Sequence, residues 1–97
     1  RMGPLASQAQ FDKVRGYLAL ASSEGGRVLA TGRVLDSAPR DGWWQAPVVL
    51  DGLPIDSRCA TEEIFGPVLS LHAFDDEAEA IAMANATRYG LAATVLT

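Results

Sequence analysis

The pattern that most constrains the fold is a succession of strand, helix and strand in the second half of the sequence. Residues 68–74 form an apolar segment of strand length, and Asp76 with Glu79 then has the spacing of a capping box. Gly90 is placed to end that helix, and residues 91–96 return to strand character. Two strands joined by one helix pair only in parallel, through a right-handed crossover. The sequence therefore predicts an α/β fold with a parallel sheet and a C-terminal βαβ unit.

The first half predicts one long helix followed by strands. Ser7 and Gln10 have the spacing of a capping box, in which the side chain of each residue satisfies a backbone amide of the other. A Gly-Gly pair stops the helix, and a short strand follows. Residues 43–50 regain strand character, but Pro47 lacks an amide donor and therefore predicts an edge or irregular strand. The helix presents one apolar face, formed by Phe11, Val14, Leu18 and Ala21.

Composition limits the chain to one domain and argues against several classes of partner. The 97 residues, 48% apolar and 21% charged, allow one small core and do not resemble a disordered chain. The net charge is −4 and the basic residues form no cluster, which argues against binding to nucleic acid or to an anionic membrane. No apolar run reaches the length of a membrane span, and no segment resembles a signal peptide. We therefore expect a cytoplasmic protein, and the single cysteine agrees with a reducing compartment.

Residues 61–68, Thr-Glu-Glu-Ile-Phe-Gly-Pro-Val, are the segment richest in chemistry. Glu63 and Phe65 are two residues apart, so in an extended segment their side chains point the same way and can contact one ligand. Gly66 and Pro67 then force a turn ahead of the next strand. An acid at the mouth of a buried strand is an arrangement that α/β proteins use to bind cofactors. On composition alone, however, Glu63 is more simply interpreted as a solvated loop acid.

Five short segments of the chain, in the same order, resemble the aldehyde dehydrogenase superfamily. They are Gly3-Pro4-Leu5 with Gln10-Phe11, then Gly42–Pro47, and finally Glu62–Val68 and Asn85–Ala93, which look like the two C-terminal signatures of the family. The resemblance implies that residues 1–97 are part of the catalytic domain of an enzyme that oxidises an aldehyde to a carboxylic acid with NAD or NADP. The Rossmann half, the cysteine nucleophile and the general base of the family lie outside these residues. We therefore expect no dehydrogenase activity from this chain alone.

The resemblance implies cofactor contacts for three residues. The second acid of the first signature, here Glu63, accepts hydrogen bonds from the hydroxyls of the nicotinamide ribose in the family, and one ionised carboxylate accepts two neighbouring hydroxyls well. Phe65 is expected to pack on the same end of the cofactor. The family places a Gln-Phe pair at the cofactor site, which implies a contact for Gln10. The capping role explains Gln10 without any ligand, so both interpretations stay open.

Cys59 and His72 are predicted to be structural residues. The nucleophile of the family lies far upstream of the first signature in a Gly-Gln-x-Cys context, whereas Cys59 is four residues before Glu63 and lacks that context. His72 stands alone in an apolar segment, with no second ligand spaced to bind a metal. The sequence thus predicts no catalytic residue and no metal ligand in this chain.

Substrate and assembly are suggested by weaker features. Gly52-Leu53-Pro54 ahead of Ala60–Glu63 resembles the semialdehyde dehydrogenases of aromatic-ring cleavage, such as those acting on hydroxymuconic semialdehyde. The chain begins with Arg and stops inside a predicted strand, so we expect a piece of a longer protein. Strand edges left exposed favour a homo-oligomer. The competing interpretation is a non-catalytic truncated module that acts only in oligomer assembly.

Overall fold

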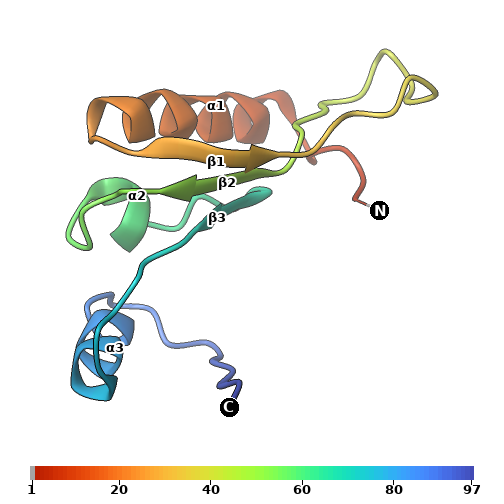
Figure 1. Ribbon diagram of the computed structural model, residues 1–97. Coiled ribbons are helices and arrows are strands. Elements are labelled where there is room, and N and C mark those ends of the chain that lie inside the picture. Colours follow the sequence, from red (N-terminus) through yellow and green to blue (C-terminus); the bar gives the residue numbers. More distant parts are fainter. Residues whose placement is uncertain (1) are drawn as a thin grey trace.

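A computed structural model describes residues 2–97 as a small mixed sheet with helices around it (Figure 1). Helix α1 runs alongside the strands, and helix α3 lies apart from them, after an extended connection that follows the last strand (Figure 1). None of the helices in residues 2–97 is both long and apolar enough to cross a membrane. The elements are α1 (Gln8–Ser23), β1 (Arg27–Thr31), β2 (Val48–Asp51), α2 (Arg58–Thr61), β3 (Val68–Ser70) and α3 (Glu77–Ala84).

The sheet confirms the α/β class but is mixed, so the expectation of a parallel sheet holds for only one of its two strand pairs. Strand β2 lies between β1 and β3, antiparallel to β1 and parallel to β3. Of the two positions predicted for residues 43–50, the edge position is wrong, because β2 is the central strand, whereas the irregular one fits residues 44–47, which form no strand. The reason is that β2 begins at Val48, one residue after the proline, so the missing amide lies outside the ladder. The carbonyl of Pro47 still accepts a hydrogen bond from the Gly32 amide at 2.8 Å.

The predicted C-terminal βαβ unit is not confirmed. Helix α3 forms and is capped by Asp76, whose side chain accepts the Glu79 amide, but the helix already ends at the Asn85 C-cap and not at Gly90. Residues 91–97 form no strand, and the side chains of Leu91 and Leu96 are almost fully exposed. A strand needs a neighbour to satisfy its backbone groups. Within residues 2–97, nothing pairs with this segment.

The core lies between α1, the central strand and α2. Val14 and Ala21 on α1 are buried, as the apolar face of the helix predicts. Tyr17 and Leu18 of the same helix pack against the cluster as partly buried side chains. The fully packed members beside Ala21 are Val48, Leu50, Leu53 and Cys59. The side of α1 that faces the core also faces the segment between α2 and β3, and this places the candidate site.

Candidate functional site

The candidate site is built on Glu62–Gly66, here called the Glu63 loop, which connects α2 to β3. Phe65 has a φ of 58°, in the left-handed region that bulky residues rarely adopt. The residue is 71% exposed. Gly66 lies directly against α1, because a Cβ built on it would be 2.4 Å from Val14 Cγ2. Gly66, the one glycine of the Glu63 loop, thus stands at the point where loop and helix touch.

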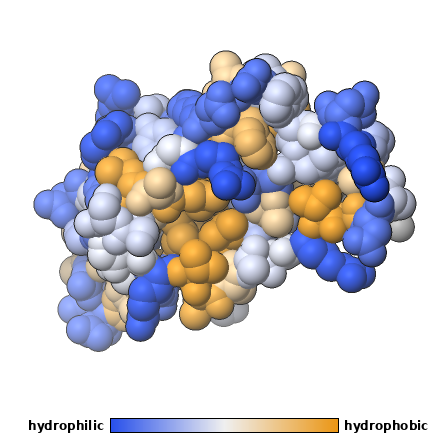
Figure 2. All heavy atoms as spheres, turned by 90° about the horizontal axis from the view of Figure 1, so that it is seen from above, coloured by the Kyte–Doolittle hydropathy of each residue, from blue (hydrophilic) through white to orange (hydrophobic). Residues whose placement is uncertain are grey.

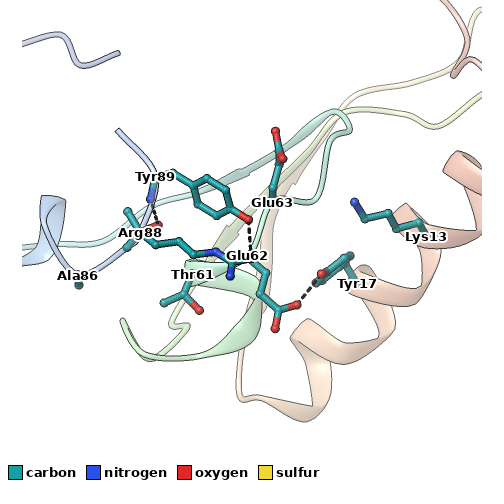
Figure 3. Close-up of a pocket in the computed structure, with 9 residues that line it drawn as sticks. Lys13, Tyr17, Thr61, Glu62, Glu63, Ala86, Arg88 and Tyr89 are labelled. Carbon is teal, nitrogen blue, oxygen red and sulfur yellow. Dashed lines mark hydrogen bonds between the residues drawn. The ribbon is translucent and has the colours of Figure 1, made fainter. Parts of the chain in front are cut away.

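Glu63 is exposed and lines an open hollow of about 510 Å³ beside the loop (Figure 3). Lys13 and Tyr17 of α1 form one side of the hollow, and the segment after α3 forms another, with Arg88 and Tyr89. Two cationic side chains, Lys13 and Arg88, therefore line the same hollow as Glu63. The lining residues are Lys13, Tyr17, Thr61, Glu62, Glu63, Ala86, Thr87, Arg88 and Tyr89.

The two adjacent acids of the loop have different surroundings and point in opposite directions (Figure 3). The Glu62 carboxylate accepts hydrogen bonds from the Tyr17 hydroxyl at 2.6 Å and from the Arg58 guanidinium at 2.8 and 3.0 Å. Arg58, and after it Tyr17, lower the pKa of Glu62 to about 2. The hydrogen bond between Tyr17 and Glu62 in turn raises the pKa of the Tyr17 hydroxyl. Glu62 is therefore committed to internal partners, while Glu63 faces the hollow.

Gln10 takes part in both helix capping and the loop. Its backbone amide donates to Ser7 Oγ at 3.2 Å, so the N-cap predicted at Ser7 is confirmed. The other half of the predicted capping box is wrong, because within residues 2–97 the Gln10 side chain bonds to the loop and not to the Ser7 amide. The Nε2 group donates to the backbone carbonyl of Phe65 and lies 3.4 Å from that of Ile64. The structure thus brings Gln10 and Phe65 together, but of the three predicted cofactor-binding residues only Glu63 lines the hollow.

Cys59 is buried, and its thiol lies 3.4 Å from the Tyr17 carbonyl. Burial, and after it the neighbouring Glu24 carboxylate, raise the pKa of Cys59 to about 12. Since the thiolate is the nucleophile, this environment agrees with the structural role predicted for the residue. His72 is half-buried. Among residues 2–97, no group of three His, Cys, Asp or Glu side chains is arranged to hold a metal ion.

The residues that the sequence interpretation missed are Lys13, Tyr17, Arg58 and Arg88. A signal existed for three of them. Arg58 precedes Glu62 by four residues, the spacing of a helical ion pair. Tyr17 follows Gln10 by seven residues, which places both on one face of a helix. Lys13 carried no signal, and for Arg88 the signal was its place in Asn85–Ala93, a segment that carries the family resemblance; the position of both depends on how α1 and the segment after α3 meet the loop.

Comparison with known proteins identifies the family of the chain. The model of the aldehyde dehydrogenase family matches residues 1–97. A 2-aminomuconic 6-semialdehyde dehydrogenase of Pseudomonas sp is 48% identical over the whole chain, which covers 20% of that relative. The chain therefore spans about a fifth of the length of the curated relative it matches.

Solved structures give the same result. A crystal structure assigned to the aldehyde dehydrogenases, from Burkholderia cenocepacia, is 44% identical, with a TM-score of 0.86 over 91% of this chain and 18% of that one. The betaine aldehyde dehydrogenase of Staphylococcus aureus, solved in complex with NAD⁺, is 34% identical, with a TM-score of 0.84 over 93% of this chain and 18% of that one. A family match along its full length, together with these relatives, shows that the chain belongs to the aldehyde dehydrogenase family.

Proposed function

We propose that residues 1–97 are part of the catalytic domain of an NAD(P)-dependent aldehyde dehydrogenase, here called the parent enzyme. The parent enzyme oxidises an aldehyde to a carboxylic acid, and this segment forms one wall of the site for the nicotinamide ribose. The cofactor, when bound, supplies the hydride acceptor. What these residues supply is binding and orientation of the cofactor, since the nucleophile and the general base belong to the rest of the parent enzyme.

The observation that carries the proposal is that Glu62 and Glu63, although adjacent, have different surroundings. Glu62 is held by Tyr17 and Arg58, whereas Glu63 is exposed on the hollow. An exposed, ionised carboxylate can accept two neighbouring hydroxyls, and such charge-assisted hydrogen bonds are stronger than neutral ones. The residues present therefore fit a ribose diol. Lys13 and Arg88, on the same hollow, suit a ligand that also carries phosphate.

Phe65 and Gln10 are proposed as the other members of the wall. The Phe65 ring is largely exposed and adjacent to Glu63 in the loop, so it is free to pack on the nicotinamide end of the cofactor. Gln10 lies behind Phe65, at the backbone carbonyl. The choice between NAD and NADP depends on the 2′ position of the other ribose, which the dinucleotide-binding half of the parent enzyme contacts.

We propose a muconic-type semialdehyde as the substrate class to test first. Gly52-Leu53-Pro54 ahead of the loop suggests a semialdehyde dehydrogenase, and the curated relative at 48% identity acts, by its name, on 2-aminomuconic 6-semialdehyde.

Residues 91–96 are also proposed to become a strand within the complete catalytic domain. Their apolar side chains, exposed here, then gain neighbours, and the C-terminal βαβ unit closes.

The test is Glu63→Gln in the parent enzyme, with NAD(P)H formation followed at varied cofactor concentration. Loss of hydrogen bonds to a charged acceptor costs about 1.5–3 kcal/mol, so we expect the KM for the cofactor to rise about tenfold or more. The KM for the aldehyde should change little. Glu77→Gln is the matched control, because Glu77 is an exposed acid in α3 that does not line the hollow. A cofactor KM for Glu63→Gln equal to that of the control refutes the ribose contact.

A second candidate, assembly without catalysis, is favoured by the apolar surface. Apolar side chains lie open among polar ones on the face seen from above (Figure 2). Leu69, Phe74 and Ile81 are each more than half exposed, and so are Leu91 and Val95. Contiguous exposed apolar surface is typical of contacts with other protein. Sedimentation of residues 1–97 as a discrete oligomer, from cells that make no longer form of the chain, would favour the assembly role over the parent enzyme.

A further inference from the structure

We infer that Gln10 is a positioning residue that holds the Glu63 loop in its cofactor-binding shape, with helix α1 acting as its rigid support. This inference rests on the proposed function, because it assigns to Gln10 the task of orienting Glu63 and Phe65. It differs from a direct cofactor contact for Gln10. The amide of Gln10 acts through the backbone of Phe65.

One face of α1 contacts the loop from end to end. Gln10, Val14 and Tyr17 follow at intervals of four and three residues, so their side chains lie on one face of the helix. Gln10 Nε2 donates to the Phe65 carbonyl, Val14 Cγ2 fills the space beside Gly66, and the Tyr17 hydroxyl holds Glu62 at 2.6 Å. The loop is therefore fixed at both ends, and Glu63 lies between the fixed points.

Phe65 is the residue of the loop with an unfavourable backbone conformation. Its φ of 58° is sterically unfavourable for an L-residue with a bulky side chain. Such conformations persist only where the surroundings hold them, and they occur often at ligand-binding sites. The Gln10 amide is the side chain that holds the Phe65 carbonyl, so removing this donor frees the peptide to rotate. Rotation moves the Phe65 ring and, through Ile64, the Glu63 carboxylate.

Glutamine has the hydrogen-bond donors that this position requires. Its amide group carries two N–H donors, and two successive carbonyls, those of Ile64 and Phe65, lie at its Nε2. The side chain starts from the first turn of α1, whose N-terminus Ser7 fixes. A methionine has nearly the same length without any donor. A glutamate has the same shape, but its ionised carboxylate faces two carbonyl oxygens.

The experiment is Gln10→Met in the parent enzyme, with Gln8→Met as the matched control. Gln8 lies in the same helical turn, is exposed, and makes no side-chain hydrogen bond within residues 2–97. The readouts are the Kd for NADH by fluorescence, the Kd for AMP by displacement, and kcat. We expect the Kd for NADH to rise about tenfold for Gln10→Met, with the Kd for AMP unchanged, since AMP lacks the nicotinamide half. An unchanged Kd for NADH, or an equal loss of both ligands, overturns the inference.

Gln10→Glu keeps the test decisive if the methionine variant does not fold. At high pH the carboxylate repels the Phe65 carbonyl, and on protonation it becomes a donor. The loss of NADH affinity relative to the wild type should therefore narrow as the pH falls, and a loss that does not change with pH contradicts the positioning role. Failure of the inference is distinct from failure of the proposed function. If Glu63→Gln weakens the cofactor and Gln10→Met does not, only the role of Gln10 is refuted.

Discussion

Replacing Gly66 with alanine should drive the Glu63 loop away from helix α1. A Cβ at Gly66 would lie 2.4 Å from Val14 Cγ2 and 3.3 Å from Val14 Cγ1. Val14 is 0% exposed, and a β-branched side chain in a helix is nearly confined to one χ1 rotamer, so it cannot turn aside. The backbone of Gly66 is outside the left-handed region, so the cost comes from overpacking alone. Overpacking of this kind costs about 1–3 kcal/mol.

A second substitution tests that reasoning directly. Val14→Ala removes both γ carbons and leaves only Val14 Cβ, 3.4 Å from the new methyl group, at ordinary van der Waals distance. Alone, it should cost about 2 kcal/mol, from two buried methyl groups and the cavity they leave. In the double variant the methyl group at position 66 fills part of this cavity. The double variant should then be at least as stable as Val14→Ala, with a favourable coupling of about 1–3 kcal/mol.

The assay is the apparent melting temperature of the parent enzyme, measured at one scan rate because large enzymes commonly unfold irreversibly. Gly16→Ala is the control, since Gly16 is in α1 with no atom within 4 Å of a built Cβ. Alanine there should raise stability by about 0.5–1 kcal/mol through helix propensity. If Gly66→Ala behaves like Gly16→Ala, or if the two single costs simply add in the double variant, the close contact between loop and helix is refuted.

Two further predictions concern titratable groups. Because Arg58 and Tyr17 lower the pKa of Glu62 from 4.5 to about 2, its contribution to stability is fully present above the unfolded-state value and is lost as the pH falls through about 2. Between about pH 4.5 and pH 2, the loss of folded protein with falling pH, followed by near-ultraviolet circular dichroism, should therefore be less steep for Glu62→Gln than for the wild type. Identical curves would contradict the hydrogen bonds of Arg58 and Tyr17 to Glu62. The buried thiol of Cys59, with its pKa raised to about 12, should resist iodoacetamide in the native parent enzyme at about pH 8 and react after denaturation. Peptide mass mapping measures this, and native labelling at the rate of a free thiol would show that Cys59 is accessible.

The parts of the fold that depend on neighbouring residues were predictable from the sequence. Ser7 and Asp76 cap their helices through contacts only three residues away, at 3.2 and 2.9 Å. Strand pairing was not predictable in the same way, since β2 became the central strand through contacts with both β1 and β3. The expected strand at 91–96 did not form, because a sequence pattern does not show whether a partner strand is present. Its apolar pattern is present, but a strand forms only where the chain supplies a partner.

The candidate site, too, was predictable from the sequence only in part. The resemblance singled out Glu63, Phe65 and Gln10, and the structure places Glu63 on the hollow with Phe65 beside it in an exposed loop. The partner of Gln10 was not predictable, because the hydrogen bond to Phe65 joins residues 55 positions apart. The left-handed φ of Phe65 was unexpected as well. The alternation expected of an extended segment therefore does not hold at Phe65, and the hollow lined by Glu63 is not lined by Phe65 or Gln10.

The two adjacent acids show what a signature alone leaves undecided. Glu62 and Glu63 have the same chemistry, and nothing in the seven-residue run distinguishes them. The distinction comes from outside the run: Arg58 lies four residues earlier and Tyr17 lies on a helix near the start of the chain, and both bind Glu62. With one carboxylate held in this way, its neighbour points to the opposite side and lies exposed on the hollow (Figure 3). The cofactor-binding role proposed for the Glu63 loop thus depends on the loop and helix α1 together.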